Sequence, residues 1–430
     1  MIKIKTSSEQ IHSQGGIFIT HEILKRYGID KLIDKHIGPR GTGNGYSYSY
    51  SDIVLGLVYS QHCGATCIED IQQMVETFTN HPGFKMSSPD TVLRMFDELK
   101  TETIVHTSKT GVKHEFNSNL PLNDLLQKIC TQTKVISTKE KYTLDYDNTI
   151  NLCNKYDAKR TYKNDKGYQP GVGSINNIPI FVEGRNGNSP AKYLMADTLN
   201  QLFDLTNKND IEIAKFRSDS AAYQQDVIEL MEDRHITFYI RAINCEELRM
   251  QIKEITEWKA IEYNYNQIEI AEMWYAPFGG EKKYRVIVQR KKNKAAQLDA
   301  FSESVYEYYS IITLDTIGTP EEIYTFYNQR GGTSEDVIDI LKNDFNWNHL
   351  PCSFLNQNTV FMILSAISYV LTVWMKTIIG KHIKGITQKG RLKQYMFMFI
   401  NVAAKWIHSG RQTILKIFSN KGYEFIPLKI

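Results

Sequence analysis

Three acidic residues far apart in the chain have the residue type and context for phosphoryl-transfer chemistry. Asp147 lies in YTLDYDNTI at the end of an alternating run, Asp219 ends a second such run in AKFRSDSAAY, and Glu335 opens the amphipathic segment SEDVIDILK. Two Mg²⁺ ions about 3.5–4 Å apart can neutralise the attacking and leaving oxygens of a phosphodiester, and carboxylates are their usual protein ligands. We therefore predict a two-Mg²⁺ site, open also to Mn²⁺, in which Asp147 bridges both ions while Asp219 and Glu335 each hold one.

The segment around the third acid predicts a helix that carries further polar groups. Glu335, Asp339 and Lys342 are spaced i, i+4 and i+7 and so share one helical face. The opposite face is apolar, which would pack the helix against a sheet. We expect Lys342 and Arg330 to contact DNA phosphates and Tyr327 to stack or hydrogen-bond near the cleaved strand.

Each of these acids taken alone has a simpler explanation. An Asp at a strand end is usually a turn former, and a Glu in a first helical turn usually interacts with the helix dipole. The order strand, strand, helix, together with the Tyr, Arg and Lys around Glu335, favours the catalytic interpretation. The first position stays open between two residues, because Asp145 and Asp147 lie on the same face of a strand; Asp147 is the first choice.

The order of elements predicts an α/β catalytic core with a mixed sheet covered by helices. Short helical periods dominate the first 135 residues, where Ser88 and Pro89 indicate a helix start. Strand-like runs alternate with helices from about residue 141, and a strand-rich segment interrupts this pattern. The predicted regions are a helical DNA-binding or dimerisation region (1–135), a catalytic core (136–241 and 314–375), a β-rich insertion (242–313) and a basic helical DNA-binding or dimerisation region (376–430).

The small net charge of +3 conceals a strongly basic end. Residues 371–430 carry a net charge of +10, which leaves −7 for the rest of the chain. Such a segment, which is also rich in apolar residues, is typical of a folded polyanion-binding surface, although a merely solvated helical face is the alternative. The basic residues that we expect to contact DNA here are Lys389, Arg391, Lys393 and Arg411.

One uncharged apolar stretch, residues 357–375, approaches the length of a membrane span. Interspersed Asn, Ser and Thr residues favour a buried core helix instead, and we expect no association with membranes. We find no signal-peptide pattern, and six scattered cysteines fit reduced thiols. These features predict a cytoplasmic protein.

The segment YNQRGGTSEDVIDILK resembles the Tyr-x-x-Arg…Glu-x6-Lys signature of bacterial cut-and-paste insertion-sequence transposases of the DDE type. The same resemblance matches Asp147 and Asp219 to the first two catalytic acids, and it extends to GYQP at 167–170 and WIHSGRQTILKI at 406–417. It implies an RNase H-like, retroviral-integrase fold for the core. One departure is that four residues separate Arg330 from Glu335, where the usual signature has three.

The resemblance also implies a reaction and partners. A homodimer would hold double-stranded DNA, cut the terminal inverted repeats of a mobile element by way of hairpin ends, and join them to target DNA. The setting would be the bacterial cytoplasm, at the nucleoid. Two other functions stay open: a DNA-binding regulator derived from an inactive transposase, and a nuclease of the same fold.

Overall fold

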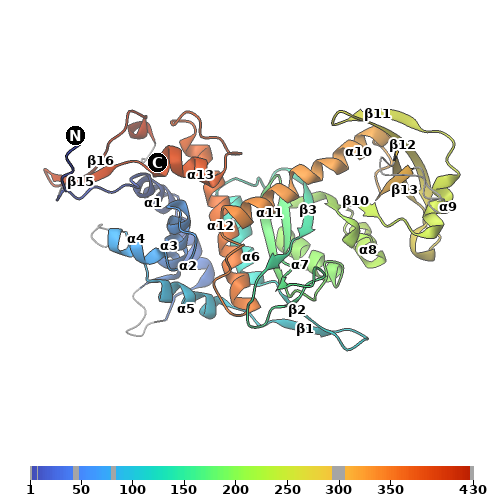
Figure 1. Ribbon diagram of the computed structural model, residues 1–430, viewed down its shortest axis with the longest axis horizontal. Coiled ribbons are helices and arrows are strands. Elements are labelled where there is room, and N and C mark those ends of the chain that lie inside the picture. The colour runs from blue at the N-terminus through green and yellow to red at the C-terminus, as the bar shows by residue number, and fades with distance from the viewer. Residues whose placement is uncertain (1, 7, 42–47, 79–83, 293–305, 427–430) are drawn as a thin grey trace.

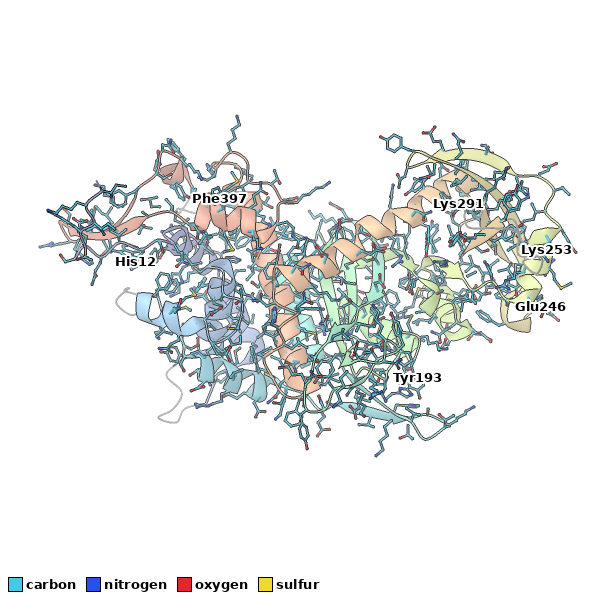
Figure 2. The ribbon with its side chains drawn as sticks, in the orientation of Figure 1. His12, Tyr193, Glu246, Lys253, Lys291 and Phe397 are labelled. Carbon is cyan, nitrogen blue, oxygen red and sulfur yellow. The ribbon has the colours of Figure 1, made fainter. Side chains whose placement is uncertain are left out.

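The computed structural model describes residues 2–6, 8–41, 48–78, 84–292 and 306–426. Figure 1 shows three parts along the longest axis of the molecule: the N-terminal helices together with the C-terminal elements at one end, a central sheet with its helices, and a β-rich lobe at the other end. Segments from opposite ends of the chain therefore share one part. Figure 2 shows His12 beside the C-terminal strands, where its backbone forms a bridge with Ala404.

The N-terminal region is helical up to residue 99, as predicted. Ser88 caps the fifth helix with its hydroxyl, and Pro89 occupies the first helical position. The prediction of a helical region up to residue 135 is wrong for its last part, because two strands precede the final helix and pair at the edge of the central sheet. The elements are α1 (Gly16–Arg26), α2 (Ile29–Ile37), α3 (Tyr50–His62), α4 (Ile71–Phe78), α5 (Pro89–Leu99), β1 (Ile104–Thr107), β2 (Lys113–Asn117) and α6 (Leu120–Gln132).

The centre of the molecule is a mixed sheet, as predicted. Its strands run in the order β8-β7-β3-β9-β10, in which β3, β9 and β10 are parallel while β7 and β8 are antiparallel to their neighbours. Helices α7 and α8 provide the crossovers that parallel strands require. These elements are β3 (Lys141–Asn148), β7 (Gly171–Ile175), β8 (Ile178–Arg185), α7 (Met195–Lys208), β9 (Glu212–Ser218), α8 (Gln225–Asp233) and β10 (Thr237–Ala242), with a small separate sheet of β4 (Asn151–Leu152), β5 (Lys159–Arg160) and β6 (Lys166–Tyr168).

The predicted β-rich insertion has the expected strands, and these strands extend the central sheet. β14 pairs antiparallel with β10, and β13, β12 and β11 follow in order, so that one sheet of eleven strands crosses the molecule. Residues 293–305 of the insertion lie outside the described residues. The insertion consists of α9 (Glu246–Lys253), β11 (Lys259–Tyr263), β12 (Asn266–Tyr275), β13 (Tyr284–Lys292) and β14 (Tyr306–Thr313), and Figure 2 labels Glu246, Lys253 and Lys291 on this lobe.

The apolar stretch is the buried core helix that we expected. Helix α12 (Leu355–Ile379) runs between the N-terminal helices and the central sheet (Figure 1), and 89% of its most apolar window is buried. Its polar side chains find partners inside the protein: Thr372 donates to the carbonyl of Ser368, and the Tyr369 hydroxyl donates to the carbonyl of Asn177. By length and composition it is the one helix of the described residues that could cross a membrane.

The expectation of a helical C-terminal region is wrong for most of that region. Only α13 (Leu392–Tyr395) and a π-helical turn (Met396–Ile400) follow α12, and then β15 (Ala404–Ser409) pairs with β16 (Gln412–Ile417). Gly410 and Arg411 both have positive φ, as a two-residue hairpin turn requires. Polar and apolar residues alternate on both sides of this turn, and this pattern, which indicates strands, was not used in predicting a helix.

Candidate active site

The register of two parallel strands brings the first two acids together. Tyr146 on β3 pairs with Ser218 on β9, so the residues that follow them, Asp147 and Asp219, lie side by side at the carboxyl ends of adjacent strands. Both line one cavity of about 330 Å³. The end of β9 is held in a 3₁₀ turn, because the Asp219 carboxylate accepts a hydrogen bond from the backbone of Ala221.

Asp147 sits in a partly buried, polar environment. Its Oδ2 accepts from Arg330 Nη1 at 2.9 Å, and the Ser334 hydroxyl lies 3.4 Å from the same oxygen. Burial raises the pKa of Asp147, the Arg330 guanidinium opposes that shift, and the nearby Asp219 adds to it. Arg330 therefore pairs with the carboxylate that we predicted to bind metal, and only its Nη1 is used in this contact.

The structure does not bring Glu335 to the other two acids. Helix α10 (Pro320–Asn328) is followed by a 3₁₀ turn (Gln329–Gly332) and then by α11 (Ser334–Asn343), on which Ser334, and not Glu335, reaches Asp147. Glu335 is exposed and makes no hydrogen bond or ion pair with the described residues.

Two of the three predicted metal ligands, Asp147 and Asp219, lie together in this arrangement, and the pair of Mg²⁺ ions stays a prediction. Within the described ranges, no group of three or more His, Cys, Asp or Glu side chains is placed to bind a metal. Asp147 and Asp219 supply two carboxylates, of which one is already paired with Arg330. Glu335 is seven residues from Lys342, which lines the cavity, and so lies about 20° from it around the helix, but Glu335 itself is exposed and does not line the cavity.

Lys342, which the sequence predicted to contact DNA phosphates, lies beside the two aspartates. Its side chain lines their cavity and donates to the carbonyl of Ile150 at 2.7 Å. Burial lowers its pKa. Three further lining residues, Tyr162, Lys163 and Gln169, were not predicted as site residues. The GYQP motif, which contains Gln169, was the available signal, whereas Tyr162 and Lys163 come from a loop with no recognisable pattern.

Asp145, the second choice for the first acid, is not part of the cavity. It is 1% exposed and forms two hydrogen bonds with Arg217, at 2.7 and 2.8 Å. Tyr327 is also buried, and its hydroxyl donates to the carbonyl of Ser218 at 3.2 Å. Tyr327 thus fixes α10 to the end of β9 rather than offering a surface for DNA to stack on.

Comparison with known proteins shows the family of this chain. Residues 1–426 match the family model described as transposase DDE domain, group 1. The chain belongs to this DDE transposase family. No curated protein matches the chain.

One solved structure similar to this member of the transposase family is the cryo-EM structure of the piggyBac transposase synaptic complex with hairpin DNA. The two are 11% identical, and the similarity covers 89% of this chain and 77% of the other, with a TM-score of 0.42. A likeness at this level establishes neither fold nor function for this chain.

The four C-terminal basic residues that we predicted to contact DNA differ in their surroundings. Lys389 and Lys393 are exposed and make no ion pair in the described part of the transposase, and Arg411 is exposed at the tip of the β15–β16 hairpin. Arg391 instead pairs with Asp339 and, at 3.0 Å, with Asp344. Lys389 and Arg391 also line a second cavity of about 580 Å³ between α11, α12 and the C-terminal region.

Proposed function

We propose that this member of the family is an active DNA transposase, which binds the terminal inverted repeats of a mobile element, cuts DNA there and joins the ends to target DNA. The observation that carries the proposal is the placement of Asp147 and Asp219 side by side at two parallel strand ends, in a cavity that Lys342 also lines. Strand ends of a sheet are where polar groups can leave the core without burying unpaired charge.

The proposal includes an RNase H-like core. Its support is the strand order β8-β7-β3-β9-β10, with antiparallel pairing on one side of β3 and parallel pairing on the other. This order places the first acid on the central strand and the second on its parallel neighbour. Helix α11, which would carry the third acid, contacts β3 and β7.

The proposed chemistry is Mg²⁺-dependent cleavage of phosphodiesters, with Mn²⁺ able to replace Mg²⁺. When bound, the ions would neutralise charge on the attacking and leaving oxygens. Asp147, Asp219 and Glu335 would hold them, which requires Arg330 to leave Asp147 and Glu335 to turn into the cavity. Lys342 and Lys163 would contribute positive charge for DNA phosphates at the same place.

The proposed partners are double-stranded DNA at the element ends and at the target, and a second copy of the chain. The basic C-terminal region and the N-terminal helices would bind the ends and the partner protomer. Hairpin intermediates, and action at the nucleoid in the bacterial cytoplasm, belong to the same proposal.

A second function is favoured by a specific observation. Glu335 lies outside the cavity, and Arg330 neutralises Asp147. A protein fixed in this arrangement would bind DNA without cutting it, as a regulator derived from a transposase would. A nuclease that cuts without joining is the third possibility.

The deciding experiment uses the genomic DNA that flanks the gene on both sides as the probe. Wild type, Asp147→Asn, Asp219→Asn and Glu335→Gln are compared for binding and for Mg²⁺-dependent cleavage and joining. We expect all four proteins to bind and only wild type to cut and join. If all four bind equally and none cuts, the enzyme is excluded in favour of the regulator; cutting without a joined product would identify the nuclease.

A further inference from the structure

A buried ion pair lies directly beneath the two aspartates of the site. Asp145 and Arg217 precede Asp147 and Asp219 by two residues each, on the adjacent strands β3 and β9. Asp145 and Arg217 are 1% and 5% exposed, and their two hydrogen bonds are 2.7 and 2.8 Å long. The pair therefore ties together the two strands that present the acids.

The same pair also reaches the corner between α10 and α11. Arg217 Nη1 donates to the carbonyl of Phe326 on α10 at 2.6 Å, and its guanidinium lies 4.7 Å from the Phe326 ring centre. Thr333, immediately before α11, places its hydroxyl 2.6 Å from Asp145 Oδ2 and 2.9 Å from the carbonyl of Arg330. A hydroxyl has one proton, and the closer, charged acceptor favours donation to Asp145.

Two glycines, Gly331 and Gly332, precede Thr333, and their present backbone conformation is one that other residues could also adopt. Gly331 and Gly332 have no positive φ, and a Cβ added at either would meet nothing within 4 Å. Neither packing nor backbone geometry requires glycine here, so the pair supplies main-chain freedom between Arg330 and Thr333. Arg330 can therefore move while Thr333 stays fixed to Asp145.

We propose that Asp145, Arg217 and Thr333 are positioning residues that fix the start of α11 against the strand ends. The fixed point at Thr333 keeps Glu335 within reach of the cavity, while the glycine pair lets Arg330 release Asp147. This inference rests on the proposed function for its effect on cleavage, but the attachment of α11 can be measured without cleavage.

The test compares Thr333→Val, which removes the hydroxyl and little else, with Thr333→Ser, which retains it. The control for the same substitution at a threonine remote from the site is Thr206→Val on α7, because Thr206 is buried and its hydroxyl donates to the backbone carbonyl of Phe203. We expect Thr333→Val to slow cleavage of the flanking DNA about 10- to 100-fold and to raise the Mg²⁺ concentration that gives half-maximal rate, with DNA affinity unchanged. Thr333→Ser should restore the rate, and Thr206→Val should keep it.

Hydrogen exchange separates this inference from the proposed function. The amides at the start of α11, from Ser334 to Val337, should exchange faster in Thr333→Val than in wild type, Thr333→Ser or Thr206→Val. Unchanged exchange overturns the inference, as does a Thr333→Ser protein as slow in cleavage as Thr333→Val. If wild type does not cut DNA, the proposed function fails, and the exchange data still decide whether Thr333 holds α11.

Discussion

Two aspartates on one face of β3 have opposite roles because their partners differ. Asp145 is sealed beneath the site by Arg217, whereas Asp147 opens into a cavity and is only loosely held by Arg330 and Ser334. A carboxylate with both oxygens bonded to a buried guanidinium stabilises the fold and has no oxygen available for a ligand. One that lines a cavity at a strand end can exchange its partner for a ligand.

This difference predicts different consequences for the two Asp→Asn changes. Asp145→Asn leaves Arg217 buried and uncompensated, so we expect the free energy of unfolding to fall by about 3–5 kcal/mol. Asp147→Asn should cost less than about 1.5 kcal/mol, because its pair with Arg330 is partly solvated and the amide can still accept a hydrogen bond. Urea denaturation measures both values; equal losses would contradict the assignment of Asp145 to structure and Asp147 to the site.

At the scale of elements, the C-terminal region is fixed to α11 and α12 by buried charge. Asp344, just after α11, accepts from Arg391 and from the backbone of Leu392 at 2.9 Å. Lys376, near the end of α12, is 4% exposed and donates to the carbonyl of Gly390. Burial lowers the pKa of Lys376 to about 8, with Asp344 opposing that shift and Arg391 adding to it.

The lowered pKa of Lys376 predicts how stability depends on pH. Between about pH 8 and the ordinary lysine value near 10.4, the unfolded chain binds a proton that the folded protein has released, so the free energy of unfolding rises with pH. Between pH 8 and pH 10, we expect the free energy of unfolding of wild type to rise by about 2 kcal/mol relative to that of Lys376→Met. Urea denaturation of both proteins at pH 8 and pH 10 measures the difference in their free energies of unfolding. Titration of tyrosines affects both proteins equally and so cancels in this difference. A difference that does not change with pH would contradict the prediction.

At the scale of the whole molecule, the four C-terminal residues predicted to contact DNA differ in whether they form ion pairs within the protein. Arg391 is exposed but pairs with Asp339 and Asp344, whereas Lys389, Lys393 and Arg411 are exposed and form no ion pair with the described residues. Figure 1 shows the β15–β16 hairpin at the end of the molecule that lies opposite to the insertion. DNA bound by both the hairpin and the catalytic cavity would have to follow the molecule's long axis.

The salt dependence of DNA binding tests whether Lys389 and Lys393 contact phosphates. Each phosphate contact adds roughly 0.9 to the slope of log K against log salt, so Lys389→Gln with Lys393→Gln should reduce the slope by about 1.8. The matched control replaces Lys141 and Lys259, which are exposed but each paired with a glutamate. An unchanged slope in the first variant, or an equal loss in the control, would show that these lysines are merely solvated.

Local pattern in the sequence determined much of this protein. Alternation and helical periods predicted the strands of the core, the start of α5 at Pro89 and the burial of α12, because each depends on nearby residues and on the apolar character of one face. The position of Asp147 and Asp219 at strand ends was also predictable, and Asp147, the first choice over Asp145, is the one that lines the cavity.

Only the tertiary structure decided the features that depend on distant partners. The pairing of Asp145 with Arg217, the extension of the central sheet by β14, and the hairpin in place of a C-terminal helix all require residues far apart in the chain to meet. The same holds for Glu335, whose spacing to Lys342 fitted the family signature although Ser334, and not Glu335, lies against Asp147. A sequence motif fixes the order of residues along a helix, but packing of that helix fixes which of them faces the site.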